Sequence, residues 1–380
     1  MRESFFGASA MEAVNYIWPI ADLGSCSIGF GVCKKTGMVF QTTVVEQKEM
    51  LKYYSNTATY VNPNHSGKPM PGKVNDVKRY LSTIKEGLSQ WPDSVLQIGS
   101  SDGYTLSCFK EAGSKLVVGV EPGKLSRQHA KDYYGIDCID GSAEVFNLNQ
   151  VFDLIVLTHI LEHIYDPVLV LNKLRRNLKT SGHLLIEVPL WESLEHQPMG
   201  VLTFEHVNYF TEKTLNVLLN STGFEVVFTE KLFDVNLYPV ICILAKKVNE
   251  FSNQNIFCNE GQALLNAYIE RENHFWNLAE QKILAKIDKE KETYIWGAGI
   301  HTSQLLGTSK LKDHLVLNGI FDSSESKHGK TLFGFTIKKP LVHLLEKGTN
   351  ILISSFASEE YIYKQIMSIR QDLNVVRIYD

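Results

Sequence analysis

Short apolar runs alternate with amphipathic segments along residues 91–247, and the same alternation returns along residues 293–380. In the first stretch the apolar runs cover residues 95–98, 116–120, 136–139, 152–157, 183–188, 224–228 and 237–244. Short apolar runs bounded by turns are typical of buried strands, and the segments between them are typical of helices. The pattern therefore predicts an α/β fold with a doubly wound sheet, whose ligands bind at the carboxyl ends of the strands.

Helix-start and helix-stop signals support this alternation. Asp166 and Pro167 are expected to begin a helix that ends at Gly182, and Thr211 a helix that ends at Gly223. A capping side chain or proline at the start and a glycine at the end are the usual punctuation of a helix.

The first strand of the sheet leads into a glycine turn. Residues 95–103 read Val-Leu-Gln-Ile-Gly-Ser-Ser-Asp-Gly, with a G-x-x-x-G spacing between Gly99 and Gly103 instead of the G-x-G-x-x-G that cradles a pyrophosphate. Glu121 closes the second strand, where an acidic side chain accepts hydrogen bonds from ribose hydroxyls. A glycine turn without phosphate chemistry beside a ribose acceptor favours an adenosine ligand without phosphates, and S-adenosylmethionine is the candidate cofactor.

Later strand ends extend this predicted cofactor site. Ser142 and Ala143 belong to a loop suited to lie against an adenine, and the fourth strand delivers Thr158 and His159 to its carboxyl end. The residues expected to bind the cofactor are Gly99, Ser100, Asp102, Gly103, Glu121, Pro122, Ser142, Ala143, Thr158 and His159.

Residues 94–245 resemble a class I S-adenosylmethionine-dependent methyltransferase in residues 98–103, 120–122, 158–167 and 182–189. More narrowly, residues 204–210 (Phe-Glu-His-Val-Asn-Tyr-Phe), followed by a second nucleotide-binding-like domain, resemble the three-part sugar C-methyltransferases. That family acts on nucleotide-activated keto-sugars in deoxysugar or surface-polysaccharide biosynthesis. The resemblance implies C-methylation of such a sugar, with S-adenosylhomocysteine as the product of the cofactor.

Four segments are expected: an irregular N-terminal lid over residues 1–90, a methyltransferase domain over 91–247, a helical linker over 248–292 and a small Rossmann-like domain over 293–380. The resembled family holds a zinc ion in its N-terminal domain between two cysteine pairs. Here Thr36 replaces one cysteine of the later pair, and Cys26 and Cys33 supply two ligands at most. Because structural zinc needs four ligands, the sequence predicts no metal.

Methyl transfer from a sulfonium needs an aligned acceptor and a group that removes its proton. Glu205 and His206 follow a glycine- and proline-containing loop at the expected edge of the sheet, so His206 is predicted to be the base and Glu205 to orient it. His163 is expected to support the reaction. The alternative for both His163 and His206 is a purely structural role, in which each histidine only fixes its own turn or loop. In the resembled family a tyrosine stands two residues before this glutamate, where this chain has Thr203.

The resemblance also implies which residues contact the substrate. Those residues are Tyr53, Tyr60, Thr203 and Tyr209 near the lid, and Gly297, Gly299 and Asp322 in the C-terminal domain. The C-terminal glycine turn has Thr302 in place of a third glycine, so this domain either helps to hold a nucleotide-sugar or is purely structural.

Composition limits the classes of partner that the protein is expected to bind. The 38 basic and 42 acidic residues are near balance without a basic tract, which gives no support to nucleic-acid binding. No apolar run is long enough to span a bilayer, and six scattered cysteines fit a reduced, cytoplasmic protein. We expect a small-molecule sugar substrate and a monomer or homodimer. O-methylation of a saccharide hydroxyl and a non-catalytic cofactor-binding module are the alternatives to C-methylation.

Overall fold

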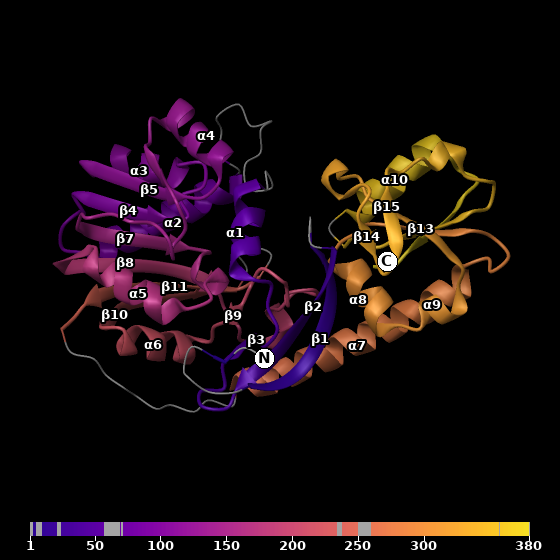
Figure 1. The fold of residues 1–380 in the computed structure, drawn as a ribbon, viewed down its shortest axis with the longest axis horizontal. Helices are drawn as coiled ribbons and strands as arrows, with labels where there is room; N and C mark the ends of the chain where they lie inside the picture. Colours follow the sequence, from indigo (N-terminus) through magenta and orange to yellow (C-terminus); the bar gives the residue numbers. More distant parts are fainter. Residues whose placement is uncertain are drawn as a thin grey trace.

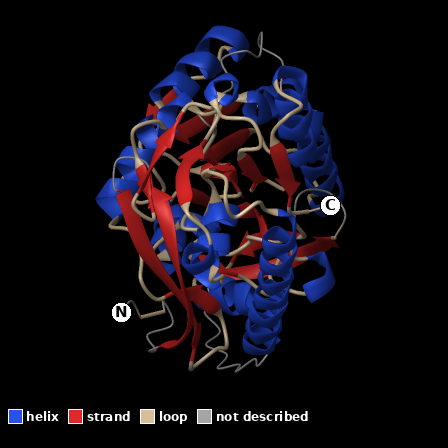
Figure 2. Cartoon of the chain, turned by 90° about the vertical axis from the view of Figure 1, so that its right-hand side faces the viewer, coloured by secondary structure: helices blue, strands red, loops and turns tan. Residues whose placement is uncertain are grey.

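The computed structural model describes residues 3–4, 10–20, 24–56, 69, 71–233, 238–249, 260–356 and 358–379. Within these residues the strands form three sheets, and helices lie on both sides of the strands (Figures 1 and 2). The largest sheet lies in one lobe and the C-terminal sheet in the other, with the N-terminal strands between them (Figure 1).

The central sheet has the strand order β10-β11-β8-β7-β4-β5-β6. Its strands are β4 (Ser94–Ile98), β5 (Leu116–Glu121), β6 (Cys138–Asp140), β7 (Phe152–Thr158), β8 (Leu178–Pro189), β10 (Phe224–Leu232) and β11 (Val240–Lys247). The strands β4 to β8 are parallel, and β11 is antiparallel to both of its neighbours. The strand order reverses at β4, which places the expected crevice at the carboxyl end of that strand.

Two apolar layers sandwich the central sheet because successive strand residues point to opposite faces. The helices that cover it are α2 (Pro71–Gly87), α3 (Tyr104–Glu111), α4 (Lys124–Tyr134), α5 (Pro167–Arg176) and α6 (Glu212–Ser221). In β4, Val95 packs with α2 and α3, whereas Leu96 packs with α5 and α6. Asp166 and Thr211 cap α5 and α6 as predicted, but α5 ends at Arg176 because the chain enters β8 at Leu178.

The N-terminal region is not irregular in the residues described. It contains a long antiparallel hairpin of β1 (Ala10–Ile20) and β2 (Gly24–Cys33), then β3 (Val39–Gln41) and α1 (Gln47–Asn56). Every residue of β2 from 28 to 33 is buried, and Ile28, Phe30 and Val32 point into one apolar core. The glycines between them, which are poor strand formers, obscured this strand in the sequence. This sheet is completed by β9 (Asn208–Tyr209), which pairs with β3.

A single helix, α7 (Glu260–Lys286), connects the N-terminal sheet to the C-terminal domain (Figure 1). Its first half places Leu265 and Tyr268 in the core of the N-terminal sheet, and its second half places Trp276 and Ile283 in the C-terminal core. Leu278, in the same helix, is half exposed.

The C-terminal sheet has the order β14-β15-β13-β12-β16-β17, and its strands are parallel except for the β14–β15 hairpin. Its elements are β12 (Thr293–Trp296), α8 (Ile300–Thr308), α9 (Leu311–His314), β13 (Leu317–Phe321), β14 (Thr331–Leu332), β15 (Phe335–Lys338), β16 (Asn350–Ile353), α10 (Glu359–Ile369) and β17 (Asn374–Arg377). The parallel strands and their helices make a second, smaller Rossmann-like fold, as predicted.

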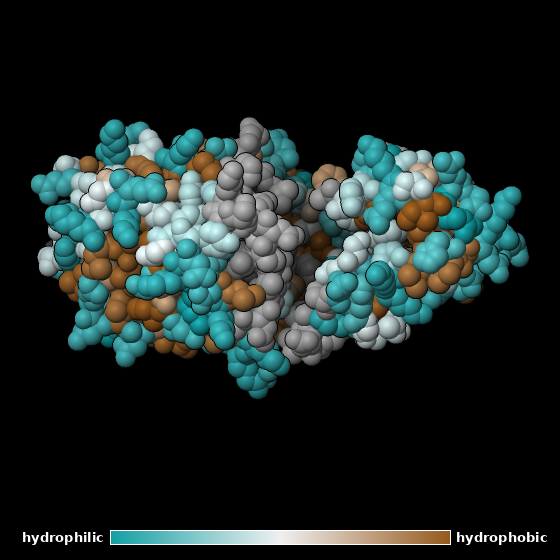
Figure 3. Space-filling view, turned by 90° about the horizontal axis from the view of Figure 1, so that it is seen from above, coloured by the Kyte–Doolittle hydropathy of each residue, from teal (hydrophilic) through white to brown (hydrophobic). Residues whose placement is uncertain are grey.

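Seen from above, a hollow separates the two lobes, and hydrophilic side chains cover much of their outer surface (Figure 3). In the part of the chain that the structure describes, every helix is too short or too polar to cross a bilayer.

Candidate active site

A cavity of about 350 Å³ opens at the carboxyl ends of β4, β5 and β7. Helix α1 covers one side of it with Met50, Leu51 and Tyr54, and the loop before β9 contributes Glu205 and His206. Its volume and its mixture of apolar walls with a few polar groups are typical of a small-molecule site.

The turn after β4 requires glycine. Gly99 has φ of +68°, and a Cβ atom there would lie 2.1 Å from Ile160 Cδ1. Gly103 has φ of +82°, and a Cβ atom there would lie 2.7 Å from Ala130 Cβ. Left-handed φ and close packing both exclude larger residues, so the backbone of this turn forms the floor of the cavity.

Glu121 lines the cavity at the end of β5. Its two carboxylate oxygens accept hydrogen bonds from the backbone N–H groups of Ser101, at 2.9 Å, and Gly123, at 2.8 Å. Burial raises the pKa of Glu121, and these two donors oppose that increase. The contacts hold the carboxylate beside the glycine turn, in position to receive ribose hydroxyls.

Most of the residues predicted to bind the cofactor line this cavity. They are Gly99, Glu121, Pro122, Ser142, Ala143, Thr158 and His159. Ser100, Asp102 and Gly103 do not: Ser100 points behind the turn to Cys138, Asp102 pairs with Lys73 on α2, and Gly103 packs against α4. These three residues shape the turn from behind.

His159 lies between two buried carboxylates. Its Nδ1 atom is 3.5 Å from Glu162 Oε1, its Nε2 atom is 3.3 Å from Glu187 Oε1, and its φ is +55°. Burial lowers the pKa of His159, but the contacts with the two carboxylates outweigh burial and raise that pKa to about 10. Arg79 and Tyr80 of α2 also bind Glu187, so α2 anchors this network from behind the sheet.

This pKa predicts how stability depends on pH. Because the folded-state pKa of His159 lies above the ordinary value of 6.5, its stabilising contribution is complete below pH 6.5 and is lost as the pH rises through 10. The difference in free energy of unfolding between the wild type and His159→Gln should shrink by about 2–4 kcal/mol from pH 6 to pH 10. Urea unfolding of both proteins at several pH values measures it, with His129→Gln, on the outer helix α4, as the control. Parallel curves for the two proteins would show that folded His159 is not protonated.

His163 and His206 face each other beside Glu162. Their ring centroids are 4.9 Å apart, and His163 Nε2 is 3.8 Å from Glu162 Oε1. His163 Nδ1 lies 2.9 Å from the backbone oxygen of Glu205 and 3.1 Å from the hydroxyl of Tyr54. The three residues predicted to be catalytic, His206, Glu205 and His163, are therefore together on the cavity wall.

The surroundings of His206 differ from those expected. Burial lowers the pKa of His206 to about 3, with a further decrease from His163 and an opposing effect of Glu162. The Glu205 carboxylate accepts a hydrogen bond from Tyr53 at 3.1 Å. Glu162, and not Glu205, is therefore the carboxylate that acts electrostatically on this imidazole.

The N-terminal sheet holds the loop that carries this pair. The side-chain amide of Gln41 donates to the backbone oxygens of Thr203 and His206, both at 2.8 Å, and its backbone N–H donates to Val207. Strand β3 therefore fixes the backbone of the loop that carries Glu205 and His206. The N-terminal sheet is in this way attached directly to the wall of the cavity.

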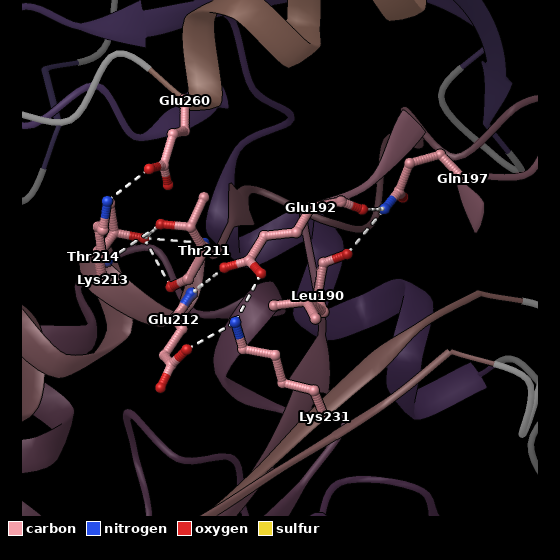
Figure 4. Close-up of polar contacts among 9 residues, drawn as sticks. All are labelled: Leu190, Glu192, Gln197, Thr211, Glu212, Lys213, Thr214, Lys231 and Glu260. Carbon is pink, nitrogen blue, oxygen red and sulfur yellow. Dashed lines mark hydrogen bonds and ion pairs between the residues drawn. The ribbon is translucent and has the colours of Figure 1, made fainter. Parts of the chain in front are cut away.

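A second polar network fixes the neighbouring segment (Figure 4). Glu192 accepts from the backbone N–H of Glu212 at 2.9 Å and pairs with Lys231 at 2.8 Å, while Gln197 donates to the backbone oxygens of Leu190 and Glu192. The two networks hold the chain on both sides of Glu205 and His206.

The residues predicted to contact the substrate are placed unevenly. Tyr53 reaches the site through Glu205, and Tyr60 lies outside the described residues. Thr203 does not line the cavity, because its hydroxyl accepts from the His206 N–H at 3.2 Å. Tyr209 is buried against Trp191 and Phe30, so it belongs to the core of the lid sheet.

In the C-terminal domain, the residues predicted to contact the substrate stabilise the local turn after β12. Asp322 accepts from the Ala298 N–H at 2.8 Å and pairs with Lys327 at 2.9 Å, and a Cβ atom on Gly297 would lie 2.5 Å from the Ser354 oxygen. Gly297, Gly299 and Asp322 are not among the residues that line the cavity at β4.

Two polar residues of the cavity that the sequence analysis missed lie close to His206, namely Tyr238 and Glu162. Tyr238 lines the cavity from the turn before β11, with its ring 6.2 Å from that of His206, and nothing in the local sequence marks it. Glu162 had a detectable signal: His159, Glu162 and His163 have the spacing that gathers side chains on one side of a helical turn, and Leu161–His163 is a 3₁₀ helix.

One known protein family matches part of this chain. A family model described as a methyltransferase domain matches residues 70–228. Residues 70–228 form a class I S-adenosylmethionine-dependent methyltransferase domain. The domain's first helix is α2, which packs on the central sheet, so the match begins well before residue 91.

Among curated proteins, the C-methyltransferase NovU of Streptomyces niveus is 31% identical over 142 residues, covering 36% of this chain and 33% of that protein. A ubiquinone biosynthesis O-methyltransferase of Actinobacillus pleuropneumoniae is 30% identical over 152 residues, covering 37% of this chain and 63% of that protein. The chain thus spans less than two thirds of both relatives. A solved S-adenosylmethionine-dependent methyltransferase from Aquifex aeolicus aligns with a TM-score of 0.38 at 18% identity, covering 47% of this chain and 94% of that chain.

Proposed function

We propose that this protein transfers a methyl group from S-adenosylmethionine to a small acceptor held in the cavity at β4. The observation that supports it most is the juxtaposition of the Gly99 turn and Glu121 with Glu205, His206 and His163 on one cavity wall. A cofactor-binding half and a proton-transfer half share a single enclosed space, as an in-line displacement requires.

The residues present fit the cofactor. Glu121 would hold the ribose hydroxyls, Ser142 and Ala143 would lie against the adenine, and the Gly99 turn and His159 would hold the amino-acid end. When bound, S-adenosylmethionine supplies an electrophilic methyl group on its sulfonium. Helix α1 covers one side of this space, so bound ligands would displace water from it and strengthen the polar contacts within it.

We assign proton removal from the acceptor to His206, with His163 beside it. The lowered pKa keeps His206 neutral at pH 7, which leaves a ring nitrogen free to accept a proton but makes the ring a weak base. The Glu162 carboxylate, which opposes this lowering of the pKa, would stabilise the protonated ring. The hydrogen bond from the Gln41 amide to the His206 backbone oxygen keeps the imidazole in place.

Tyr238 supports carbon as the methylated atom. An enolate needs a hydrogen-bond donor for its oxygen, and the family tyrosine that could supply one is Thr203 in this chain. Burial raises the pKa of Tyr238, so its phenol remains protonated and can donate into the cavity from beside His206. Tyr238 therefore offers the phenol that position 203 lacks.

The proposed acceptor is a nucleotide-activated keto-sugar. The resemblance of residues 204–210 to sugar C-methyltransferases, the C-methyltransferase named among the relatives and the second Rossmann-like domain support this class. O-methylation of a hydroxyl is the second candidate, favoured by Thr203 and by the O-methyltransferase among the relatives.

Thermal-shift screening tests the substrate class. In the presence of S-adenosylhomocysteine, a dTDP-, GDP-, UDP- or CDP-linked keto-sugar should raise the melting temperature above that of the cofactor product alone. The free nucleotide and the free sugar are the controls. Equal melting temperatures with every nucleotide-sugar would contradict this substrate class.

Isotope exchange distinguishes the two reactions. For C-methylation, solvent deuterium should enter the carbon next to the keto group when enzyme and sugar are mixed with S-adenosylhomocysteine. Mass spectrometry measures that exchange, and Tyr238→Phe should slow it more than it weakens sugar binding. A methyl ether product formed without any carbon-bound exchange would establish O-methylation.

A further inference from the structure

Glu162 is a buried carboxylate whose oxygens both lack a hydrogen-bond partner in the part of the chain that the structure describes. Its side chain is 1% exposed, and its nearest basic groups are His159 Nδ1 at 3.5 Å and His163 Nε2 at 3.8 Å, both longer than a hydrogen bond. Protonated His159 balances part of the charge of Glu162, but the distances leave lone pairs of this buried carboxylate available to a further ligand.

The proton on His163 is assigned by its neighbours. Its Nδ1 atom lies 2.9 Å from the Glu205 backbone oxygen, which can only accept, so Nδ1 bears the hydrogen. In the neutral ring the lone pair is then on Nε2, which faces Glu162. In this form of the ring, the Nε2 lone pair and the Glu162 carboxylate border the same small space, which a cation would fill. Anchoring Nδ1–H on a carbonyl is how proteins orient a histidine that binds a metal through Nε2.

His206 completes a set of three ligands. Its Nδ1 atom is buried and without a hydrogen-bond partner, and possible ligand atoms of Glu162, His163 and His206 all lie within 4.8 Å of one another. Around a bound first-row cation, ligand atoms are about 3–3.5 Å apart. Side-chain rotations that move these atoms by about 1 Å would therefore bring all three to bonding distance from one ion. All three residues line the cavity, which leaves the fourth position open to a ligand in it.

We propose that Glu162, His163 and His206 bind a divalent first-row transition metal ion, such as Zn²⁺ or Mn²⁺, in the wall of the cavity. Two imidazoles and one carboxylate suit these ions, whereas Mg²⁺ and Ca²⁺ prefer oxygen ligands alone. The sequence predicts that the chain binds no metal, because the cysteines of the N-terminal region are missing. The proposed site departs from that prediction through a different set of ligands.

The role of the ion rests on the proposed function. Its open position would take an oxygen of the acceptor and stabilise the negative charge that develops as the proton leaves. His206 would then be a ligand, and Glu205, which lines the cavity outside the three-residue set, would take the proton.

Metal titration tests this site. The full chain, freed of metal by a chelator, is titrated with Zn²⁺, Mn²⁺ or Mg²⁺ by calorimetry, and with Co²⁺ by visible absorption. We expect one first-row ion per chain and much weaker binding of Mg²⁺. Glu162→Gln and His206→Ala should each weaken binding by at least about 10–100-fold, because removing a second-shell partner alone costs that much. The matched control is His196→Ala, since His196 also pairs with a glutamate, Glu195 at 3.6 Å, outside the cluster.

Folding of each variant is checked by its melting curve and its affinity for S-adenosylhomocysteine. The proposal is overturned if the wild type binds no stoichiometric ion, or if Glu162→Gln and His206→Ala, both folded, bind it as tightly as His196→Ala. A different result would contradict the proposed function, namely a wild-type chain that does not bind S-adenosylhomocysteine.

Discussion

His206→Ala should lower turnover by about 10²–10⁴-fold while leaving the affinity for S-adenosylhomocysteine within about twofold of the wild type. The imidazole lies beside His163 and Glu162, which the proposal assigns to the acceptor and not to the cofactor. A loss of this size is expected whether the ring accepts the proton directly or holds a cation that acidifies the acceptor. Single-turnover methyl transfer measures the rate, and calorimetry measures the affinity.

If His206 takes the proton directly, His163→Ala should lose less activity, because His163 only supports it. If both imidazoles bind a cation, the two variants should lose activity to a similar extent. The control is His196→Ala, which removes a half-exposed imidazole from a loop outside the reacting centre. A single-turnover rate for His206→Ala equal to that of the wild type would refute both roles of this residue.

Glu121→Ala should weaken S-adenosylhomocysteine binding by about 10–150-fold for each hydrogen bond lost from its carboxylate to the ribose. The carboxylate is fixed between the N–H groups of Ser101 and Gly123, so the ligand meets an acceptor that is already oriented. Calorimetry of the wild type and the variant gives the two dissociation constants.

Because Ser101 and Gly123 lose an acceptor in Glu121→Ala, the turn itself must be checked. Glu121→Gln retains one oxygen for these donors and should weaken binding less than Glu121→Ala while melting near the wild type. Asp140→Ala is the matched control, since Asp140 ends the neighbouring strand β6 but is exposed and paired with Arg127. Unchanged affinity in Glu121→Ala would remove the ribose contact from the proposal.

Residues that directly follow a strand were predictable from the sequence. Glu121 is the last residue of β5, and Gly99 and His159 directly follow β4 and β7. Because these strands are parallel, their carboxyl ends meet at one edge of the sheet. Residues that reach the cavity through tertiary packing were not. Tyr238 comes from a turn whose place depends on β11 pairing with β8, and no local pattern encodes that pairing.

The residues predicted to contact the substrate show that neighbours in the sequence need not point into the same cavity. Thr203 and Tyr209 flank Glu205 and His206 closely, yet the pairing of β9 with β3 turns Tyr209 into a core of aromatic rings. In the same way Glu205 and His206 are sequence neighbours with separate partners, Tyr53 for one and the Glu162 cluster for the other. The direction of a side chain in a loop depends on what the loop packs against, which is distant in sequence here.

The bond from Gln41 to the His206 backbone joins residues that are 165 positions apart. At synthesis rates of about 5–20 residues per second, the ribosome needs about 8–33 seconds to make the chain between them. During that interval the hairpin of β1 and β2 can form, but the outer edge of β3 has no strand to pair with, and an unpaired edge invites association with other chains. The order of synthesis thus makes the reacting centre one of the last parts of this half of the molecule to assemble, and it exposes the nascent N-terminal sheet to misassembly until β9 emerges.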